Sequence, residues 1–235
     1  MTTLTITALH KSYLVKDQPF EVLKALQLTA PCDEITVILG ESGCGKTTLL
    51  RLISGLEKQE SGTISFSEPT KLGMVFQEAR LMPWLNVKEN ICFGLRAPAP
   101  ARELAELIAT IGLTGFEEAL PATLSGGMQQ RVSLARALIL HSKLLLMDEP
   151  FAALDYFTRR KMQQELLRIK AATKTGIILV THNIDEALTL ADKIMVMQNG
   201  LITKIWQLPA NKQRDILSEP YIQFKRDILN TLHVN

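Results

Sequence analysis

The sequence predicts an α/β protein, and two features of the chain support this prediction. Short apolar runs that fit buried strands alternate with stretches of helical spacing. A helical block near the middle separates two groups of strands, the first of which shows strand-like alternation. We therefore expect a single domain, residues 1–235, with a core at about 1–77 and 142–208. An inserted helical subdomain is expected at about 78–141 and a helical tail at about 209–235.

The composition and charge are those of an ordinary globular protein. Hydrophobic residues make up 46% and charged residues 21% of the chain. A formal net charge of +2 argues against a dedicated nucleic-acid surface. Cys32, Cys44 and Cys92 are too scattered for a zinc or redox motif and indicate reduced thiols. We find no apolar run of membrane-spanning length and no signal-peptide pattern, so work at a membrane would require a partner.

Two antiparallel strands joined by a turn are expected at the N-terminus, as a small β subdomain. Residues 4–9 alternate between apolar and polar, residues 22–28 suggest the second strand, and the turn falls at residues 16–19. Tyr13 stands just before this turn, where its ring could stack on a nucleotide base. Phe20 is the other candidate, and the sequence leaves the choice open.

A phosphate-binding loop at residues 40–47 is the most specific motif of the core. Its letters GESGCGKT fit the pattern G-x-x-x-x-G-K-[ST], between a β-branched run at 34–39 and a helical run at 48–53. The glycines let backbone N–H groups surround phosphate oxygens at a helix N-terminus. The motif lysine would reach the β- and γ-phosphates, and the threonine hydroxyl would ligate Mg²⁺. This context predicts a P-loop NTPase core that binds a nucleoside triphosphate. The residues expected to contact the nucleotide here are Gly40, Glu41, Ser42, Gly43, Cys44, Gly45, Lys46, Thr47 and Thr48.

Two further strands are expected at residues 62–66 and 72–76. The second ends at Gln77, whose amide could touch Mg²⁺ or the attacking water. Beyond it, the apolar segment 81–85 is either part of the core of the helical lobe or a docking surface for another protein.

The block that follows is helical. Asn86 is expected to cap a helix at 87–93, and a second helix is expected at 101–108. Ser125 is a natural N-cap for a third helix, at 126–139. Capping alone does not require the two glycines that follow Ser125. They would bare N–H groups and allow an anion to approach closely.

Carboxylates follow the buried strand expected at 144–147. In doubly wound sheets ligands bind at the carboxyl ends of the strands, and this strand delivers Asp148 and Glu149 there. Asp148 suits Mg²⁺ through its water shell, and Glu149 suits polarising the water that attacks the γ-phosphate.

A histidine follows another buried strand, expected at 177–181. A lone histidine at a strand end is usually structural. Because His182 would share the sheet edge of the carboxylates, a contact with the γ-phosphate is the favoured interpretation.

The C-terminal part combines a hairpin with a helix. Residues 193–198 and 201–206 flank Asn199-Gly200, a strong hairpin signal. A helix is expected from about 211 to 232, interrupted at Pro220.

In this order the motifs resemble those of the ATP-binding-cassette (ABC) transporters, from about Leu4 to Trp206. The letters LSGGMQQR, at residues 124–131, look like the signature motif that distinguishes this family from other P-loop ATPases. The resemblance implies ATP and Mg²⁺ as cofactors. The roles it implies are Q-loop residue for Gln77, Walker B pair for Asp148 and Glu149, switch histidine for His182 and adenine-stacking aromatic for Tyr13. Catalysis would then fall to Lys46, Gln77, Glu149 and His182, and metal binding to Thr47, Gln77 and Asp148.

The resemblance also implies an assembly of two copies, head to tail. The residues of one copy that would close over ATP held by Lys46 of the other are Ser125, Gly126, Gly127 and Gln129. Asp155 would contact the partner's phosphate loop. ATP would thus join the two copies, and its hydrolysis would release them.

Transport partners are implied as well. Permease subunits in the membrane would dock near Gln77 to Leu85, and an extracytoplasmic solute-binding protein would deliver the solute. No nucleic-acid partner is expected. The protein would lie peripherally on the cytoplasmic face of the inner membrane of a bacterium.

Residues 76–84 and 147–155 look like the importers of nitrate, sulfonates, taurine and related solutes, a branch that also includes uptake systems for thiamine precursors. Ala153 departs from relatives that carry serine before Leu154-Asp155, which puts hydroxyl-mediated coupling there in doubt. The alternative is a soluble cassette ATPase for DNA repair or ribosomes, but the chain lacks the coiled coil, second cassette or basic surface of such proteins. Finally, Cys44 is expected to be a reactive thiolate beside Lys46.

Overall fold

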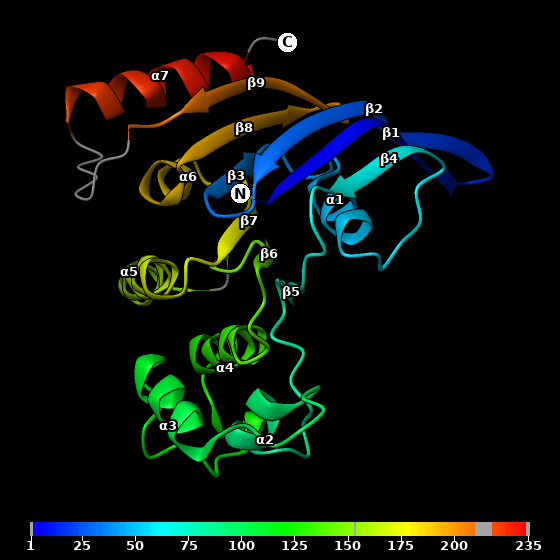
Figure 1. Ribbon diagram of the computed structural model, residues 1–235. Coiled ribbons are helices and arrows are strands. Elements are labelled where there is room, and N and C mark those ends of the chain that lie inside the picture. The colour runs from blue at the N-terminus through cyan, green and yellow to red at the C-terminus, as the bar shows by residue number, and fades with distance from the viewer. Residues whose placement is uncertain (1, 153, 210–217, 234–235) are drawn as a thin grey trace. The chain divides into compact units, whose positions relative to one another are not determined.

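The computed structural model describes residues 2–152, 154–209 and 218–233. The chain folds as two compact units (Figure 1). The first consists of Met1–Thr70 with Gly176–Asn235, and the second of Lys71–Thr175. Both combine strands with helices, so the predicted α/β fold class is confirmed. The second unit contains the whole of the expected helical segment at 78–141.

Two sheets organise the first unit. Its strands are β1 (Thr3–Val15), β2 (Gln18–Pro31), β3 (Ile35–Leu39), β4 (Ser61–Phe66), β7 (Gly176–Thr181), β8 (Lys193–Gln198) and β9 (Leu201–Gln207). β1 pairs antiparallel with β2 and β4, which gives the predicted N-terminal β subdomain. β3 pairs in parallel with β7 and β8, and β9 pairs antiparallel with β8. All residues of β3 and β7 are buried, as parallel strands covered on both faces require.

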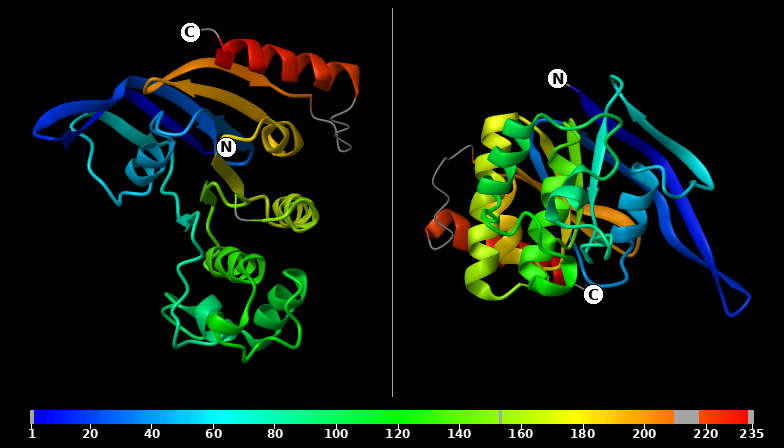
Figure 2. Two further views of the ribbon diagram at one scale, coloured as in Figure 1. Left: turned by 180° about the vertical axis from the view of Figure 1, so that it is seen from behind. Right: turned by 90° about the horizontal axis from the view of Figure 1, so that it is seen from below.

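The hairpin of β1 and β2 is longer than the sequence predicted, and it projects from the unit as a curved ribbon (Figure 2). Its turn falls on Lys16 and Asp17, both with positive φ. Register shifts interrupt the ladder, and Ala8 and Ala25 also have positive φ. Such irregularities add twist and bend to a strand pair, and they break the simple alternation by which the strand ends would be recognised.

The helices of the first unit are α1 (Lys46–Ile53), α6 (Ile184–Leu190) and α7 (Glu219–His233). α7 runs beside β8 and β9 (Figure 1), and Gln198 Nε2 donates to Thr231 O at 3.1 Å. The expected interruption at Pro220 is wrong for the described part of this helix. Pro220 lies in the first turn of α7, where its missing N–H costs no helical bond. Residues 211–217 of the expected helix lie outside the described residues.

The predicted hairpin near the C-terminus is confirmed. Asn199 and Gly200 join β8 to β9 with φ of 48° and 82°. Positive φ at both positions is what a two-residue hairpin turn of the favoured twist requires, and Asn-Gly adopts it at low cost.

Two parallel strands and a group of helices form the second unit. Its elements are β5 (Leu72–Val75), α2 (Val87–Cys92), α3 (Ala101–Thr110), the 3₁₀ turn Pro121–Thr123, α4 (Gly126–Leu138), β6 (Leu144–Asp148) and α5 (Tyr156–Thr173). β5 pairs in parallel with β6. Buried apolar side chains form a common core beneath α2, α3 and α4, namely Val87, Ile91, Ile108, Ile111, Leu113, Leu124, Val132, Ala135 and Ile139.

Helices α5 and α6 were not expected from the sequence. In α5 the buried residues Met162, Leu166 and Ile169 recur at helical spacing, so the signal was present. α6 has only seven residues, and with Asp185 and Glu186 in its first turn it holds too few apolar residues for a clear helical period. No helix in the described part of the chain is long and apolar enough to cross a membrane.

A capping box begins α2, as the sequence predicted for Asn86. The Asn86 side chain accepts from Glu89 N at 2.9 Å, and Glu89 Oε2 accepts from Asn86 N at 2.8 Å. The Asn86 amide also donates to Glu118 Oε2 at 2.7 Å. Asn86 therefore fixes both the start of α2 and its neighbouring loop.

We expect Asn86→Ala to lower the free energy of unfolding by about 1 kcal/mol, because a helix N–H loses its acceptor. Urea denaturation followed by circular dichroism measures this change. Glu89→Gln is the control, since glutamine can complete the same box. Equal losses of unfolding free energy in the two variants would contradict the capping role of Asn86.

Candidate functional site

The phosphate loop joins β3 to α1 in the first unit, as the sequence predicted. Gly40 N donates to Thr181 O at 3.3 Å, so the loop begins directly beside the end of β7. A Cβ at Gly40 would lie 2.4 Å from Met197 O, and Gly45 has a φ of 106° as it starts α1. Both positions therefore require glycine, one for close backbone approach and one for its conformation.

Lys46 is buried, and its Nζ donates to the carbonyl oxygens of Gly40 and Glu41, both at 2.8 Å. The ammonium group is thus held by the first residues of the loop. Glu41, Ser42 and Gly43 are exposed, while Thr47 and Thr48 in the first turn of α1 are half-buried. Backbone N–H groups at a helix start together with a lysine make a site for an anion.

His182 leaves the first unit's sheet at the same end as the loop. β7 and β3 are in parallel register, with Thr181 opposite Leu39. Thr181 Oγ1 donates to the buried Glu186 Oε2 at 2.7 Å and accepts from Asn183 N at 3.1 Å. The residues on both sides of the exposed His182 are therefore tied down, and Glu186 is a buried carboxylate that sequence reasoning did not single out.

In the second unit, β5 and β6 deliver their polar residues at a shared edge. Val75 stands opposite Met147, so Gln77 and Asp148–Glu149 follow at the same ends of parallel strands. Gln77 is exposed, Asp148 is buried, and Glu149 is half-buried. Glu149 has a φ of 42°, a left-handed conformation that costs a non-glycine residue about 1–3 kcal/mol. Strained positions of this kind are common at functional sites as well as in turns.

Helix α4 holds the segment that follows β5. Gln130 Nε2 donates to Phe76 O at 3.1 Å. Arg136 donates to Ala79 O and Arg80 O, each at 2.9 Å. Sequence reasoning missed Gln130 and Arg136, although two polar side chains within a helix that buries much of its surface were the available signal.

The start of α4 carries the signature residues. Ser125 caps the helix as predicted, accepting from Met128 N at 3.3 Å. A Cβ at Gly126 would meet open space, which suits close approach of a ligand. A Cβ at Gly127 would lie 3.2 Å from both Leu154 Cδ2 and Thr158 Cγ2, so packing against the start of α5 explains this glycine. Glycine is therefore explained by ligand access at position 126 and by packing at position 127.

Gln129 and Asp155 both support local backbone. The Gln129 amide donates to Pro121 O at 2.9 Å and to Leu124 O at 3.3 Å, which steadies the turn before the signature. The Asp155 carboxylate caps α5, accepting from Phe157 N and Thr158 N at 3.0 Å. Hydrogen bonds from Thr158 and Phe157 hold the pKa of Asp155 below its usual range. Ala153, whose departure was noted above, lies outside the described residues.

The apolar segment 81–85 is organised by Asn90, which is fully buried. The Asn90 side chain accepts from Met82 N at 2.8 Å and donates to Leu85 O at 2.8 Å. Leu81 packs against the helical core, whereas the side chain of Trp84 is 72% exposed. Leu81 therefore belongs to the core of the helical lobe, while Trp84 is on the surface, and a docking role for this segment stays a prediction.

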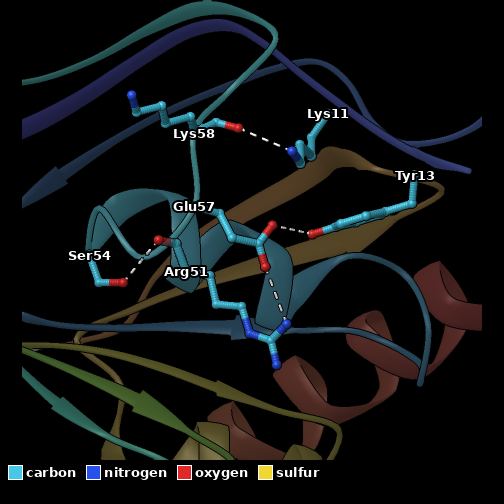
Figure 3. Close-up of polar contacts among 6 residues, drawn as sticks. All are labelled: Lys11, Tyr13, Arg51, Ser54, Glu57 and Lys58. Atoms are coloured by element: carbon cyan, nitrogen blue, oxygen red, sulfur yellow. Dashed lines mark hydrogen bonds and ion pairs between the residues drawn. The ribbon is translucent and has the colours of Figure 1, made fainter.

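The two aromatic candidates lie opposite each other, since Tyr13 of β1 pairs with Phe20 of β2. Tyr13 is half-buried and its hydroxyl bonds to Glu57 (Figure 3). A hydrogen bond from Thr48 also acts on the pKa of Tyr13, which places its hydroxyl beside α1.

Phe20 is 57% exposed and lines a cavity of about 320 Å³. Its lining also includes neighbouring residues of β2, the phosphate-loop residues 41–44, the end of β8 and the β8–β9 turn. Phe20 therefore lies beside the phosphate loop and Tyr13 beside α1, and the structure leaves both as candidates.

The expectation of a reactive Cys44 thiolate is wrong for this structure. Burial raises the pKa of the Cys44 thiol above its ordinary value, and the opposing charge of Lys46 has a smaller effect. At neutral pH the side chain is therefore a thiol, although it stands in a loop rich in N–H groups.

Comparison with known proteins agrees with this geometry. A family model described as "ABC transporter" matches residues 23–152. The aliphatic sulfonates import ATP-binding protein SsuB 1 of Pseudomonas savastanoi pv. phaseolicola is 45% identical over 214 residues, 90% of each chain. SsuB of Corynebacterium glutamicum is 45% identical over 204 residues, 85% of this chain and 82% of that protein.

Solved structures show the same fold. The dimeric ATP-binding cassette MJ0796, in a post-hydrolysis state with ADP and Pi, has a TM-score of 0.79 at 28% identity. The match covers 88% of this chain and 100% of the MJ0796 chain. CbiO1 of Clostridium perfringens has a TM-score of 0.78 at 25% identity. This match covers 96% of this chain and 94% of the CbiO1 chain.

The chain therefore belongs to the ABC transporter family, as an ATP-binding subunit with a cassette fold. Within the family it is similar to the SsuB proteins, in the branch indicated by the sequence.

The two glycines at the start of α4 provide a matched test. We expect Gly127→Ala to lower the free energy of unfolding by about 1–3 kcal/mol, because its methyl group crowds Leu154 and Thr158. Gly126→Ala should stay within about 0.5 kcal/mol of the parent. Urea denaturation measures both, and equal changes would contradict the packing role given to Gly127.

A Cys32→Ala, Cys92→Ala background isolates the Cys44 thiol. Because burial raises its pKa, the rate of alkylation by iodoacetamide at pH 7.5 should lie below that of a cysteine peptide. The rate should increase with pH, and its midpoint should lie above that of the peptide. A midpoint below that of the peptide would restore the thiolate interpretation.

Proposed function

We propose that this chain is the ATP-hydrolysing subunit of a bacterial importer of aliphatic sulfonates. The observation that carries the proposal is 45% identity over 90% of both chains to a protein named for aliphatic sulfonates import. The phosphate loop, the signature residues and the strand-end carboxylates supply the chemistry. Among the solutes left open by the sequence, which were nitrate, sulfonates, taurine and thiamine precursors, the proposal selects sulfonates.

We infer that the triphosphate is bound by the loop at 40–47, with Lys46 at the β- and γ-phosphates. The exposure of Glu41, Ser42 and Gly43 and the N–H groups at the start of α1 support this role. Glu41, Ser42, Gly43, Cys44 and Thr48 complete the cradle, and Tyr13 or Phe20 stacks on the base.

Mg²⁺ is proposed to arrive with ATP. In the described chain no group of three or more His, Cys, Asp or Glu side chains could hold a metal ion. Protein-bound Mg²⁺ commonly takes one or two oxygens from the protein and the rest from phosphates and water. Thr47, Gln77 and Asp148 offer hard oxygen atoms that fit this need. The ion would neutralise charge on the phosphate oxygens.

Hydrolysis is proposed to follow from positioning and charge. Glu149, aimed by its strained backbone, would polarise the attacking water, with Gln77 beside it. His182, tied down by Thr181 and Asn183 on either side, would contact the γ-phosphate. Lys46 would stabilise the charge that develops as water attacks the γ-phosphorus and its bond to the departing ADP breaks.

Two copies are proposed to share each ATP. Ser125 and Gly126 present an open helix start that suits a phosphate, and Gly127 keeps that start packed against α5. Asp155 would lie near the phosphate loop of the partner copy, while Gln129 would support the signature turn. The related cassette MJ0796 was solved as a dimer bound to ADP and Pi, which supports this arrangement.

The membrane partners are proposed to dock at the segment 81–85. An exposed Trp84 on a loop fixed by buried Asn90 offers a rigid apolar contact. The chain would lie on the cytoplasmic face of the inner membrane, and an extracytoplasmic binding protein would deliver the solute to the permease.

Uptake by cells tests the solute. A strain that lacks this chain should lose uptake of labelled ethanesulfonate and regain it when the chain is restored. Uptake of nitrate and of a labelled thiamine precursor serves as the control. Loss of either of these with sulfonate uptake unchanged would overturn the sulfonate assignment while leaving the ATPase assignment standing.

We expect Glu149→Gln to lower the rate of ATP hydrolysis by about 10²–10⁴-fold, because the water loses its base. ATP binding should persist, since glutamine has nearly the same shape. Steady-state phosphate release and equilibrium ATP binding measure the two effects. Glu106→Gln, at an exposed carboxylate of the same unit, is the control. Normal hydrolysis by the Glu149 variant would contradict the role of this residue.

A further inference from the structure

A cluster of polar contacts joins Tyr13 to the far end of the phosphate-loop helix (Figure 3). The Tyr13 hydroxyl donates to Glu57 Oε2. Arg51 Nη1 donates to the other carboxylate oxygen of Glu57 at 3.2 Å. Sequence reasoning did not single out either partner, because they stand 38 and 44 residues from Tyr13 along the chain.

The position of Glu57 is set by the backbone that ends α1. Leu56 N and Glu57 N donate to Arg51 O at 2.9 and 3.2 Å, and Gly55 N donates to Leu52 O at 3.1 Å. Gly55 has a φ of 74°, as this helix ending requires. The carboxylate is therefore rigidly connected to the helix whose first residues are Lys46 and Thr47.

Tyr13, by contrast, stands on an exposed stretch of the hairpin. Its neighbours Leu14 and Val15 are 78% and 53% exposed. Lys11 Nζ lies over the Tyr13 ring, 5.2 Å from its centroid, and donates to Lys58 O at 3.1 Å. The hydroxyl contact with Glu57 thus fixes the outer end of the ring, and Lys11 takes one face.

The ionisation states suit this contact. Burial and the bond to Glu57 raise the pKa of the Tyr13 hydroxyl, and the same bond holds the pKa of Glu57 below its usual range. At neutral pH the pair is a neutral donor and a charged acceptor, a strong type of hydrogen bond.

We propose that Glu57 is a positioning residue that sets the ring of Tyr13 for stacking on the nucleotide base, at a fixed place relative to the phosphate loop. The inference deepens the proposed function, since it rests on Tyr13 as the stacking aromatic. It goes beyond that function in making base recognition depend on a carboxylate that touches no nucleotide atom. Arg51 keeps this carboxylate in place.

Binding of ADP and of inorganic pyrophosphate, both with Mg²⁺, separates base recognition from phosphate binding. Glu57→Ala should weaken ADP binding by about 3–10-fold and leave pyrophosphate binding within about twofold. Tyr13→Phe should weaken ADP binding to a similar extent. The double variant should bind ADP no more weakly than the single variant of lower affinity, as expected when two residues act through one contact. Isothermal titration calorimetry measures all the constants.

Two control variants distinguish positioning from general support. Glu60 binds Ser12 N at 2.9 Å, so it ties the same loop to the same strand without touching Tyr13. Glu60→Ala should leave the dissociation constants of ADP and pyrophosphate within about twofold of those of the parent protein. Glu57→Gln keeps an oxygen acceptor for the hydroxyl and should bind ADP more tightly than Glu57→Ala.

The proposal is overturned if Glu57→Ala weakens ADP and pyrophosphate equally, or if the effects of Glu57→Ala and Tyr13→Phe multiply. Tyr13→Ala shows which premise is at fault. If it weakens ADP binding while Glu57→Ala does not, only the positioning role is wrong. If Tyr13→Ala leaves ADP binding unchanged, the stacking role of Tyr13 is wrong, and Phe20 becomes the base contact.

Discussion

The parallel ladder of β3 with β7 and β8 is the constraint on which the phosphate site depends. It places Leu39 level with Thr181 and Val196, so the loop at 40–47 and His182 leave the sheet at one end. The carbonyl oxygens of neighbouring strands then limit the loop itself, since Met197 O admits no side chain at position 40. A shift of one residue in this register would turn the side chains of β3 to the opposite face of the sheet.

Within the second unit, helix α4 connects the signature residues to the segment that follows β5. α4 begins at the signature residues, and its later residues Gln130 and Arg136 hold Phe76, Ala79 and Arg80 by their carbonyl oxygens. The signature residues and the segment after β5 are therefore connected through the same helix.

Charges buried around these strand ends are kept in place by hydrogen bonds. Lys46 and Glu186 are 5% and 4% exposed, yet the first donates to two carbonyl groups and the second accepts from Thr181. Asp148, at the end of β6, is buried as well. Burial of a charge is costly unless it is paired or hydrogen-bonded, and an apolar residue would meet no such cost. Lys46 begins α1 and Asp148 ends β6, and their proposed work on a charged ligand explains the burial of these two residues better than stability does.

The sequence by itself determined the features that arise from short-range chemistry. The loop at 40–47, the caps at Asn86 and Ser125, and the turn at Asn199-Gly200 are decided by residues within a few positions of one another. Only the tertiary structure decided what Gly127 packs against, why the pKa of Cys44 is raised, and how Tyr13 meets Glu57. These depend on burial and on contacts between residues distant in the chain, which local spacing does not encode.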